Sequence, residues 1–219
     1  VVIKSYTIVG RDATNRYYPT SWQLQGVTPA TKTSIAITGG IYYTSYTGCY
    51  YELDSSQNTE NSRFFELKAS DGTPQFGTPE IYGFEVRRSG STYTAYANTG
   101  GNTDEPNELS ITSTSSGMAA SVTLPTTGQL YGRKQSNYGT FETESVTWSD
   151  VFDTYVNLET NGGNRTASSW APLAEVSHDV NSSNTVYRSF RLYVNSSNEN
   201  NQVSINELKL FTTPLSGQS

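Results

Sequence analysis

Short runs of alternating polar and apolar residues, separated by clusters of glycine, serine, threonine and asparagine, recur along the whole chain. One run extends from Ile3 to Val9. In a second run, Trp22 and Leu24 share one face and two glutamines share the other. This period of two places alternate side chains on opposite faces of a sheet. Long amphipathic helical patterns are absent from the sequence. The pattern therefore predicts an all-β protein of the sandwich or jelly-roll kind.

The middle of the chain continues the pattern and contains its clearest local signal. Two alternating runs flank Ser89 and Gly90, which predicts a tight hairpin. One short helical turn is expected at 149–153, capped by Ser149 or Asp150. The polar stretch 98–108 is predicted to be a loop. Further strands are expected in 39–53, from Arg63, and near 109–112, 120–124 and 143–148.

Composition excludes several classes of protein. The net charge is −6 and no basic run occurs, so a nucleic-acid partner is not expected. No stretch approaches the roughly 18 apolar residues of a membrane span, so membrane insertion is not expected either. Charged residues make up only 16% of the chain, and hydroxyl and amide side chains are abundant. This composition is common in secreted, cell-surface and viral fibre proteins. We therefore expect an extracellular, cell-surface or virion-surface location.

Few residues of the chain are suited to catalysis. Cys49 and His178 are each the only residue of their type, which excludes an intrachain disulfide, a cysteine-based zinc site and a metal site with two histidine ligands built from this chain alone. Cys49 is expected to be a small core residue. The acidic pairs Glu142 with Glu144 and Asp150 with Asp153 have no spacing that fixes a glycosidase geometry. The sequence therefore predicts a protein that is not an enzyme.

Near the end of the chain the stretch YRSFRLYV is followed by a polar connection and then by QVSINELKLF. These two runs resemble the closing strands of the discoidin family, also called the coagulation factor 5/8 type C family. The N-terminal stretch SYTIVG…YYPTSWQLQG is similar to the central strand pair of the family, and SWAPL at 169–173 to the strand that follows it. The matching residues are Pro19, Ser21, Trp22, Leu24 and Gly26, then Tyr187, Arg188, Arg191 and Leu192, then Ile205, Glu207, Leu208 and Leu210.

The resemblance implies a discoidin-like (galactose-binding-like) jelly-roll sandwich interrupted by an inserted β-rich domain. Residues 1–27 and 166–219 would form the jelly roll, and residues 28–165 would form an inserted, β-sandwich-like domain. The first strands of the family would precede Val1, so we interpret the sequence as a processed or trimmed piece of a longer protein. By the resemblance, Trp22 belongs to the core and Arg191 is a structural, hydrogen-bonded arginine. Trp148 and Trp170 are also expected in the core.

In the discoidin family, ligands bind to loops at one end of the barrel. Sugar binding needs an aromatic face for the apolar side of a pyranose and planar polar groups for its hydroxyls. The loop between the first two strands offers both kinds of group. The alternative is an ordinary polar loop whose tyrosines pack back on the barrel. The candidate ligand-binding residues are Arg11, Asp12, Asn15, Arg16, Tyr17 and Tyr18.

Glu207 is the candidate metal ligand. It lies on a strand otherwise built for burial, and a buried carboxylate is costly unless it is paired or bound to a metal. In many sugar-binding relatives the matching glutamate helps to coordinate a structural Ca²⁺, which prefers oxygen ligands. The alternative is a salt-bridged or edge-exposed glutamate. The acidic cluster at 104–108 is a second place that could hold calcium, although most such loops are simply solvated.

Two functional hypotheses follow. The first is a non-catalytic carbohydrate-binding or adhesion module that recognises a surface glycan or glycoprotein through loop aromatics and polar side chains. The second is a structural virion component, in a capsid or fibre, that uses the jelly roll for contacts with neighbouring subunits. The first predicts exposed tyrosines beside Arg and Asn. The second predicts that a neighbouring subunit covers those loops across a large interface.

Overall fold

The computed structural model describes residues 1–11, 17–41, 44–45, 48–73, 83–98, 109–113, 119–134, 140–159, 163–164, 173–180, 185–198 and 202–213. In these ranges every regular element is a β-strand, apart from one 3-10 turn. The prediction of an all-β fold is therefore confirmed. No helix in the described ranges has the length and apolar character needed to cross a membrane.

The chain divides into two compact units. Unit 1 contains Val1–Thr28 and Thr154–Ser219, and unit 2 contains Pro29–Asp153. The first boundary lies one residue after the break expected from the sequence, but the second lies well before residue 165. The reason is that β15 (Thr154–Asn157) pairs with β2 (Pro19–Thr28), so the chain has already returned to unit 1 at Thr154.

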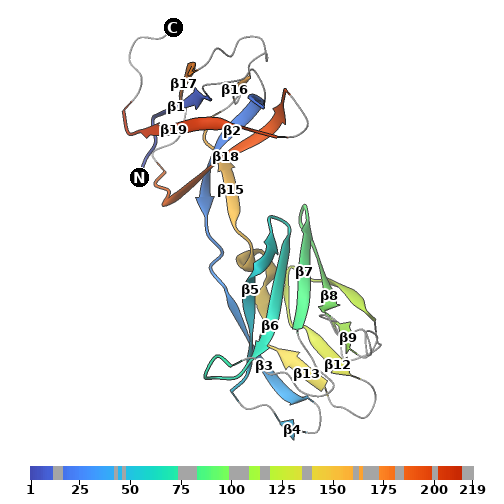
Figure 1. The fold of residues 1–219 in the computed structure, drawn as a ribbon. Coiled ribbons are helices and arrows are strands. Elements are labelled where there is room, and N and C mark those ends of the chain that lie inside the picture. Colours follow the sequence, from blue (N-terminus) through green and yellow to red (C-terminus); the bar gives the residue numbers. More distant parts are fainter. Residues whose placement is uncertain are drawn as a thin grey trace. The chain divides into compact units, whose positions relative to one another are not determined.

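Unit 1 consists of two small sheets. In one sheet, β1 (Ser5–Gly10) lies between β17 (Glu175–Asp179) and β19 (Ile205–Phe211). In the other, β2 has β18 (Ser189–Ser197) on one side and β15 and β16 (Gly163–Asn164) on the other. Figure 1 shows β18 and β19, in orange and red, in different sheets. The two closing strands of the chain therefore pair with different partners, and the polar segment between them connects the two sheets.

The two sheets of unit 1 share one hydrophobic core. Tyr6 and Ile8 from β1 face Trp22 and Leu24 from β2, and all four side chains are fully buried. The ring of Tyr187 occupies the space that a side chain at residue 26 would fill, so only glycine fits there. A Cβ at residue 26 would lie 2.6 Å from three atoms of the ring. The match of this glycine to the sequence pattern thus reflects close packing against Tyr187.

A buried polar chain crosses this core. The Trp22 Nε1–H donates to the Tyr6 hydroxyl (2.8 Å), and that hydroxyl donates to Glu159 Oε1 (2.7 Å). The backbone N–H of Leu24 donates to the same carboxylate oxygen (3.0 Å). Glu159 is only 8% exposed, so these donors compensate for the loss of water around its charge. His178 stacks on Tyr6 with ring centroids 5.2 Å apart.

Unit 2 is built around a ten-stranded sheet with the strand order β10-β8-β7-β6-β5-β3-β13-β12-β9, and β4 pairs with β3 off this path. A bridge between Ile111 in β9 and Ala119, just before β10, brings the two ends of this order together. The sheet therefore curls around a single core. The strands are β3 (Ser34–Ile41), β4 (Thr44–Ser45), β5 (Tyr50–Thr59), β6 (Ser62–Lys68), β7 (Gly83–Ser89), β8 (Thr92–Asn98), β9 (Leu109–Thr112), β10 (Ser121–Leu124), β12 (Tyr131–Lys134) and β13 (Thr140–Thr143).

The predicted hairpin is present in unit 2. Strands β7 and β8 are antiparallel and Ser89 pairs with Thr92, so the two connecting residues are Gly90 and Ser91. Gly90 has φ of +59°, a left-handed conformation that glycine adopts without steric cost. The turn is therefore shifted by one residue from the centre suggested by the sequence.

The predicted helical turn is also present, but its cap differs. It is a 3-10 turn, η1 (Trp148–Val151), preceded by the short pair of β11 (Thr127–Gly128) with β14 (Val146–Thr147). The residue at the N-cap position is Thr147, and it makes no side-chain capping bond. The expectation that Ser149 or Asp150 caps the turn was wrong, because the turn begins one residue before Ser149 so that Trp148 enters the core.

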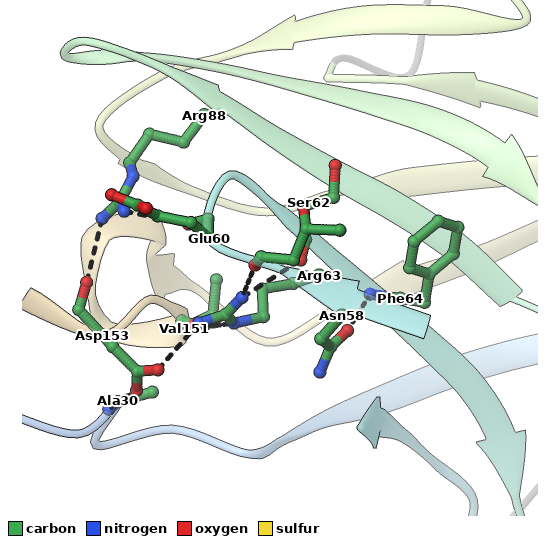
Figure 2. Close-up of polar contacts among 10 residues, drawn as sticks. Ala30, Asn58, Glu60, Ser62, Arg63, Phe64, Arg88, Val151 and Asp153 are labelled. Carbon is green, nitrogen blue, oxygen red and sulfur yellow. Dashed lines mark hydrogen bonds and ion pairs between the residues drawn. The ribbon is translucent and has the colours of Figure 1, made fainter. Parts of the chain in front are cut away.

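The two ends of unit 2 are held together by buried and half-buried charges, which Figure 2 shows. Arg63 is 5% exposed and donates to the carbonyl oxygens of Val151, Thr59 and Ser62 and to Asp153 Oδ2. Asp153 Oδ1 in turn accepts from the N–H of Ala30 (2.9 Å). We call this group, Ala30, Arg63 and Asp153 with Arg88, the Arg63 cluster. It joins the first and last residues of unit 2 to the β5–β6 hairpin.

Candidate functional site

The loop after β1 is the site predicted from the sequence, and the structure describes half of its six residues. Arg11, Tyr17 and Tyr18 lie in described segments, whereas Asp12, Asn15 and Arg16 lie outside the described residues. Arg11 is exposed and Tyr17 is half-buried.

Tyr18 does not present its ring to solvent. Its side chain is fully buried in the core of unit 1, and its hydroxyl donates to the carbonyl oxygen of Arg11 (3.0 Å). Tyr18 lies an even number of residues before Trp22 and Leu24, so the strand alternation turns it toward the core. Tyr18 therefore matches the alternative interpretation, in which a tyrosine of this loop packs back on the core. Its ring is not exposed and cannot contact a sugar.

The loop after β1 is bonded to the polar connection between β18 and β19. The N–H of Tyr18 donates to Asn198 Oδ1 (2.6 Å), and the N–H of Asn198 donates to the carbonyl oxygen of Tyr18 (3.1 Å). The N–H of Ser204 donates to the carbonyl oxygen of Tyr17 (2.6 Å), and Arg11 Nη1 lies 3.5 Å from Ser204 Oγ. The two segments therefore form one site, which we call the loop pair: Arg11, Tyr17, Asn198 and Ser204.

The backbone of Tyr17 is strained. Its φ is 68°, in the left-handed region that few residues other than glycine adopt. Such conformations persist only where surrounding bonds hold them, and they cluster at functional sites. Here the bond from the Ser204 N–H to the Tyr17 carbonyl oxygen holds the residue, together with the two bonds between Asn198 and the next residue, Tyr18. Neither partner was nominated from the sequence, although the Asn/Ser-rich composition of the β18–β19 connection was the signal that could have identified them.

Glu207 lies on the exposed, outer face of its sheet, which differs from the buried position expected for it. Lys209 Nζ lies 2.7 Å from Glu175 Oε1 and 3.7 Å from Glu207 Oε2. Glu207 and Glu175 both pair with Val9 from opposite sides, so Lys209 lies near two carboxylates. The hydrogen bond to Glu175 raises the pKa of Lys209 above its ordinary value. The positive charge nearest to Glu207 in the described structure is thus an ammonium group.

Calcium coordination by Glu207 stays a prediction. Among the described residues, no group of three His, Cys, Asp or Glu side chains is arranged to hold a metal ion. Of the second candidate cluster, Asp104, Glu105, Asn107 and Glu108 all lie outside the described residues. In the described structure, Glu207 forms an ion pair with Lys209.

The remaining residues considered from the sequence have structural contacts. Trp22 and Trp148 are fully buried in the cores of units 1 and 2, and Trp170 lies outside the described residues. Glu144 pairs with Lys32 (2.9 Å) and accepts from the N–H of Ala36 (3.0 Å). Asp153 belongs to the Arg63 cluster.

Comparison with protein-family models, with curated proteins and with solved structures finds no match to this chain. The functional reading therefore depends on the geometry described above.

Proposed function

We propose that this protein is a non-catalytic carbohydrate-binding or adhesion module at a cell or virion surface, with a discoidin-like jelly roll as unit 1. The observation that carries the proposal is the loop pair. It gathers a guanidinium, a phenol ring, an amide and a hydroxyl, from two segments about 190 residues apart in sequence, at the point where β1 ends and β2 begins.

The chemistry of the loop pair suits a sugar. A pyranose offers an apolar C–H face and a ring of hydroxyl groups, and proteins bind such ligands with aromatic faces and a few fixed polar groups. Tyr17 supplies the ring, and Arg11 and Asn198 supply planar hydrogen-bonding groups. Because a backbone bond holds Tyr17 in its strained conformation, little backbone entropy is lost at this residue when a ligand binds.

The proposal is tested with the purified chain on an array of neutral and acidic glycans, with and without millimolar calcium. We expect selective binding that Tyr17→Ala weakens about tenfold or more. Tyr96→Ala, which removes a half-buried tyrosine of unit 2, is the matched control and should leave binding unchanged. Tyr18→Ala is unsuitable because Tyr18 is a core residue. A folded chain that binds no glycan on the array would overturn the proposal.

The calcium arm of this experiment addresses Glu207. If a structural calcium ion contributes to the site, binding is lost on chelation and Glu207→Gln reproduces that loss at saturating calcium. If Glu207 serves only in the ion pair with Lys209, chelation has no effect on binding, and both Glu207→Gln and Lys209→Met leave the array profile unchanged.

One observation favours the second hypothesis, an assembly role as a capsid or fibre component. The seven exposed large hydrophobic residues among the described residues all belong to unit 1. Two of them, Val1 and Val186, lie close together because the backbone of Val1 bonds to that of Tyr187. Light scattering over a hundredfold range of concentration separates the two roles, since an assembly protein forms defined oligomers and a monovalent lectin does not.

A further inference from the structure

The outer face of the β15-β2-β18 sheet carries a second group of aromatic and amide side chains. Because Trp22 and Leu24 point into the core, Gln23 and Gln25 point outward. The register places Arg191 of β18 opposite Gln25 and Tyr193 opposite Gln23, while Asn157 of β15 lies opposite Gln25 on the other side. These side chains therefore share one face.

Arg191 lies flat across this face. Its guanidinium carbon is 3.3 Å from the centroid of the Tyr155 ring and 5.0 Å from that of Tyr193. Its Nε donates to Gln25 Oε1 (2.6 Å), and Gln25 Nε2 donates to Asn157 Oδ1 (2.7 Å). Gln25 is only 7% exposed, so the layer above it is closely packed. The hydrogen-bonded role expected for Arg191 is what the structure shows, and one consequence is that Arg191 holds two tyrosine rings in place.

The Tyr193 ring is the accessible part of this layer. The residue is 41% exposed, and its cross-strand neighbour Gln23 is half-buried beside it. A large exposed side chain normally retains rotamer freedom, which a ligand must remove at a cost in entropy. Contact with the Arg191 guanidinium restricts the ring before any ligand arrives.

The outer face of the other sheet in unit 1 is covered differently. There Lys209 crosses from β19 toward Glu175 on β17, and the small residues Ser5 and Thr7 lie beneath. Ion pairs of this kind are well hydrated and contribute little to stability. The same unit therefore covers one sheet with charges and the other with phenol rings and amides. A layer of aromatic and amide groups is thus not a general requirement for covering a sheet of this unit.

We propose that the outer face of the β15-β2-β18 sheet is a carbohydrate-binding platform for a neutral pyranose chain. The Tyr193 ring receives the C–H face of one sugar, and Gln23 and Asn157 hydrogen-bond to hydroxyls. Arg191 is a positioning residue that fixes both rings. The described outward residues of β2, β15 and β18 include no carboxylate, and Arg191 supplies their only charge. A face with so few charges suits an uncharged, hydroxyl-rich ligand.

This inference rests on the proposed function in assuming carbohydrate recognition, but it uses residues separate from the loop pair. The platform is tested by native electrophoresis through gels that each hold one soluble neutral polysaccharide: galactomannan, mixed-linkage β-glucan, xylan or dextran. We expect at least one polysaccharide to retard the wild-type chain. Tyr193→Ala should weaken that interaction tenfold or more, whereas Tyr193→Phe, which keeps the ring, should retain it within about twofold.

Two further variants give the experiment its controls. Arg191→Met keeps an apolar stem over Tyr155 but removes the guanidinium, and it should weaken binding several-fold while the circular dichroism spectrum is unchanged. Tyr96→Ala is the matched control, because Tyr96 in unit 2 also lies beneath an arginine, with Arg87 Cζ 4.1 Å from its ring centroid. This variant should migrate like the wild-type chain.

The outcomes separate the two sites. Retardation that Tyr193→Ala abolishes and Tyr17→Ala does not affect supports the platform and counts against the loop pair. Retardation lost only with Tyr17→Ala overturns the platform and supports the loop pair. If no gel retards the folded chain, the platform is overturned for neutral chains, and a signal on the glycan array alone would then belong to the loop pair.

Discussion

The two units of this protein cover their cores in different ways. In unit 2, β6 alternates between half-buried and buried positions along its whole length. In unit 1, neither β18 nor β19 contains a single fully buried residue, although Phe190, Leu192 and Leu208 pack against the core. All seven exposed large hydrophobics of the described chain also lie in unit 1. Among the described residues, unit 1 thus exposes more large apolar side chains than unit 2.

The two units also differ in their numbers of acidic residues. Unit 1 contains seven basic and six acidic residues, whereas unit 2 contains seven basic and fourteen acidic ones. The net negative charge of the chain therefore belongs to unit 2. A strongly acidic surface favours solubility and opposes self-association. Unit 2 is thus the more acidic of the two units, whereas both proposed sites lie in unit 1.

Of the variants that test the difference between the two units, Arg63→Ala should have the largest effect on stability. Arg63→Ala should destabilise unit 2 by about 3–5 kcal/mol, because it removes a buried cation that donates to several carbonyl oxygens and to one oxygen of the Asp153 carboxylate. The variant also loses the stacking of Arg63 on Phe152, where Cζ lies 5.1 Å from the ring centroid. Hydrogen exchange followed by mass spectrometry should show lost protection across β5, β6 and β7.

Lys68→Ala is the control for Arg63, since Lys68 makes its ion pairs with Glu66 and Glu52 at the surface. Its effect should stay below about 1 kcal/mol. If Arg63→Ala were as mild as Lys68→Ala, the Arg63 cluster would contribute little to closing unit 2.

The second prediction concerns the buried polar chain of unit 1. Tyr6→Phe should cost about 1–3 kcal/mol, because Glu159 loses a donor and the Trp22 N–H loses its acceptor inside the core. Burial, and then the neighbouring Glu159 carboxylate, raise the pKa of Tyr6 well above its ordinary value of 10.0. The unfolded chain therefore ionises first, and the stability from Tyr6 is present below about pH 10 and falls at higher pH by about 1.4 kcal/mol per pH unit.

Alkaline denaturation with local hydrogen exchange checks this prediction. Unit 1 of the wild-type chain should lose protection as the pH rises above 10, and Tyr6→Phe should flatten that dependence. Tyr51→Phe removes a hydroxyl from the core of unit 2 and should leave the alkaline behaviour of unit 1 unchanged. An equal alkaline slope in wild type and Tyr6→Phe would mean that other groups govern the response.

Local patterns were sufficient to predict several of the strands but not others, such as β12 and β15, and they failed where long-range pairing decides the structure. The alternation around Trp22 identified β2 and its core face, and the Ser-Gly signal identified the β7–β8 hairpin. The pairing of β15 with β2 could not be predicted, because Thr154 to Asn157 is a short strand of four residues. It joins unit 1 through its backbone pairing with β2 and through contacts of Tyr155 and Asn157 with Arg191 and Gln25, which are distant in sequence. The second domain boundary was misplaced for that reason.

The candidate sites show the same limit. Arg11 and Tyr17 could be nominated from composition, but the burial of Tyr18 depends on the register of β2 with its neighbours. Asn198 and Ser204 reach the loop only through the fold. Tyr155 and Tyr193 are 38 residues apart in the sequence and come together because Arg191 crosses β2 between them. No spacing rule in one sequence predicts such a layer.

The smallest expected effect would show that the two units respond to opposite ends of the pH scale. In unit 2, Arg87 donates to both carboxylate oxygens of Glu85, at 2.7 and 2.9 Å. Burial alone would raise the pKa of Glu85, but hydrogen bonds from Arg87 and Ser62 lower it below the ordinary value of 4.5. The stability from this pair is therefore present above about pH 4.5 and is lost as the pH falls through the lowered pKa of Glu85.

Because Arg87 is largely exposed, Glu85→Gln should cost less than about 1 kcal/mol at neutral pH and reduce the acid sensitivity of β7 and β8 in hydrogen exchange. The opposite pattern, in which unit 1 opens first in acid and Glu85→Gln does not change the acid sensitivity of β7 and β8, would contradict this role of the Glu85–Arg87 pair.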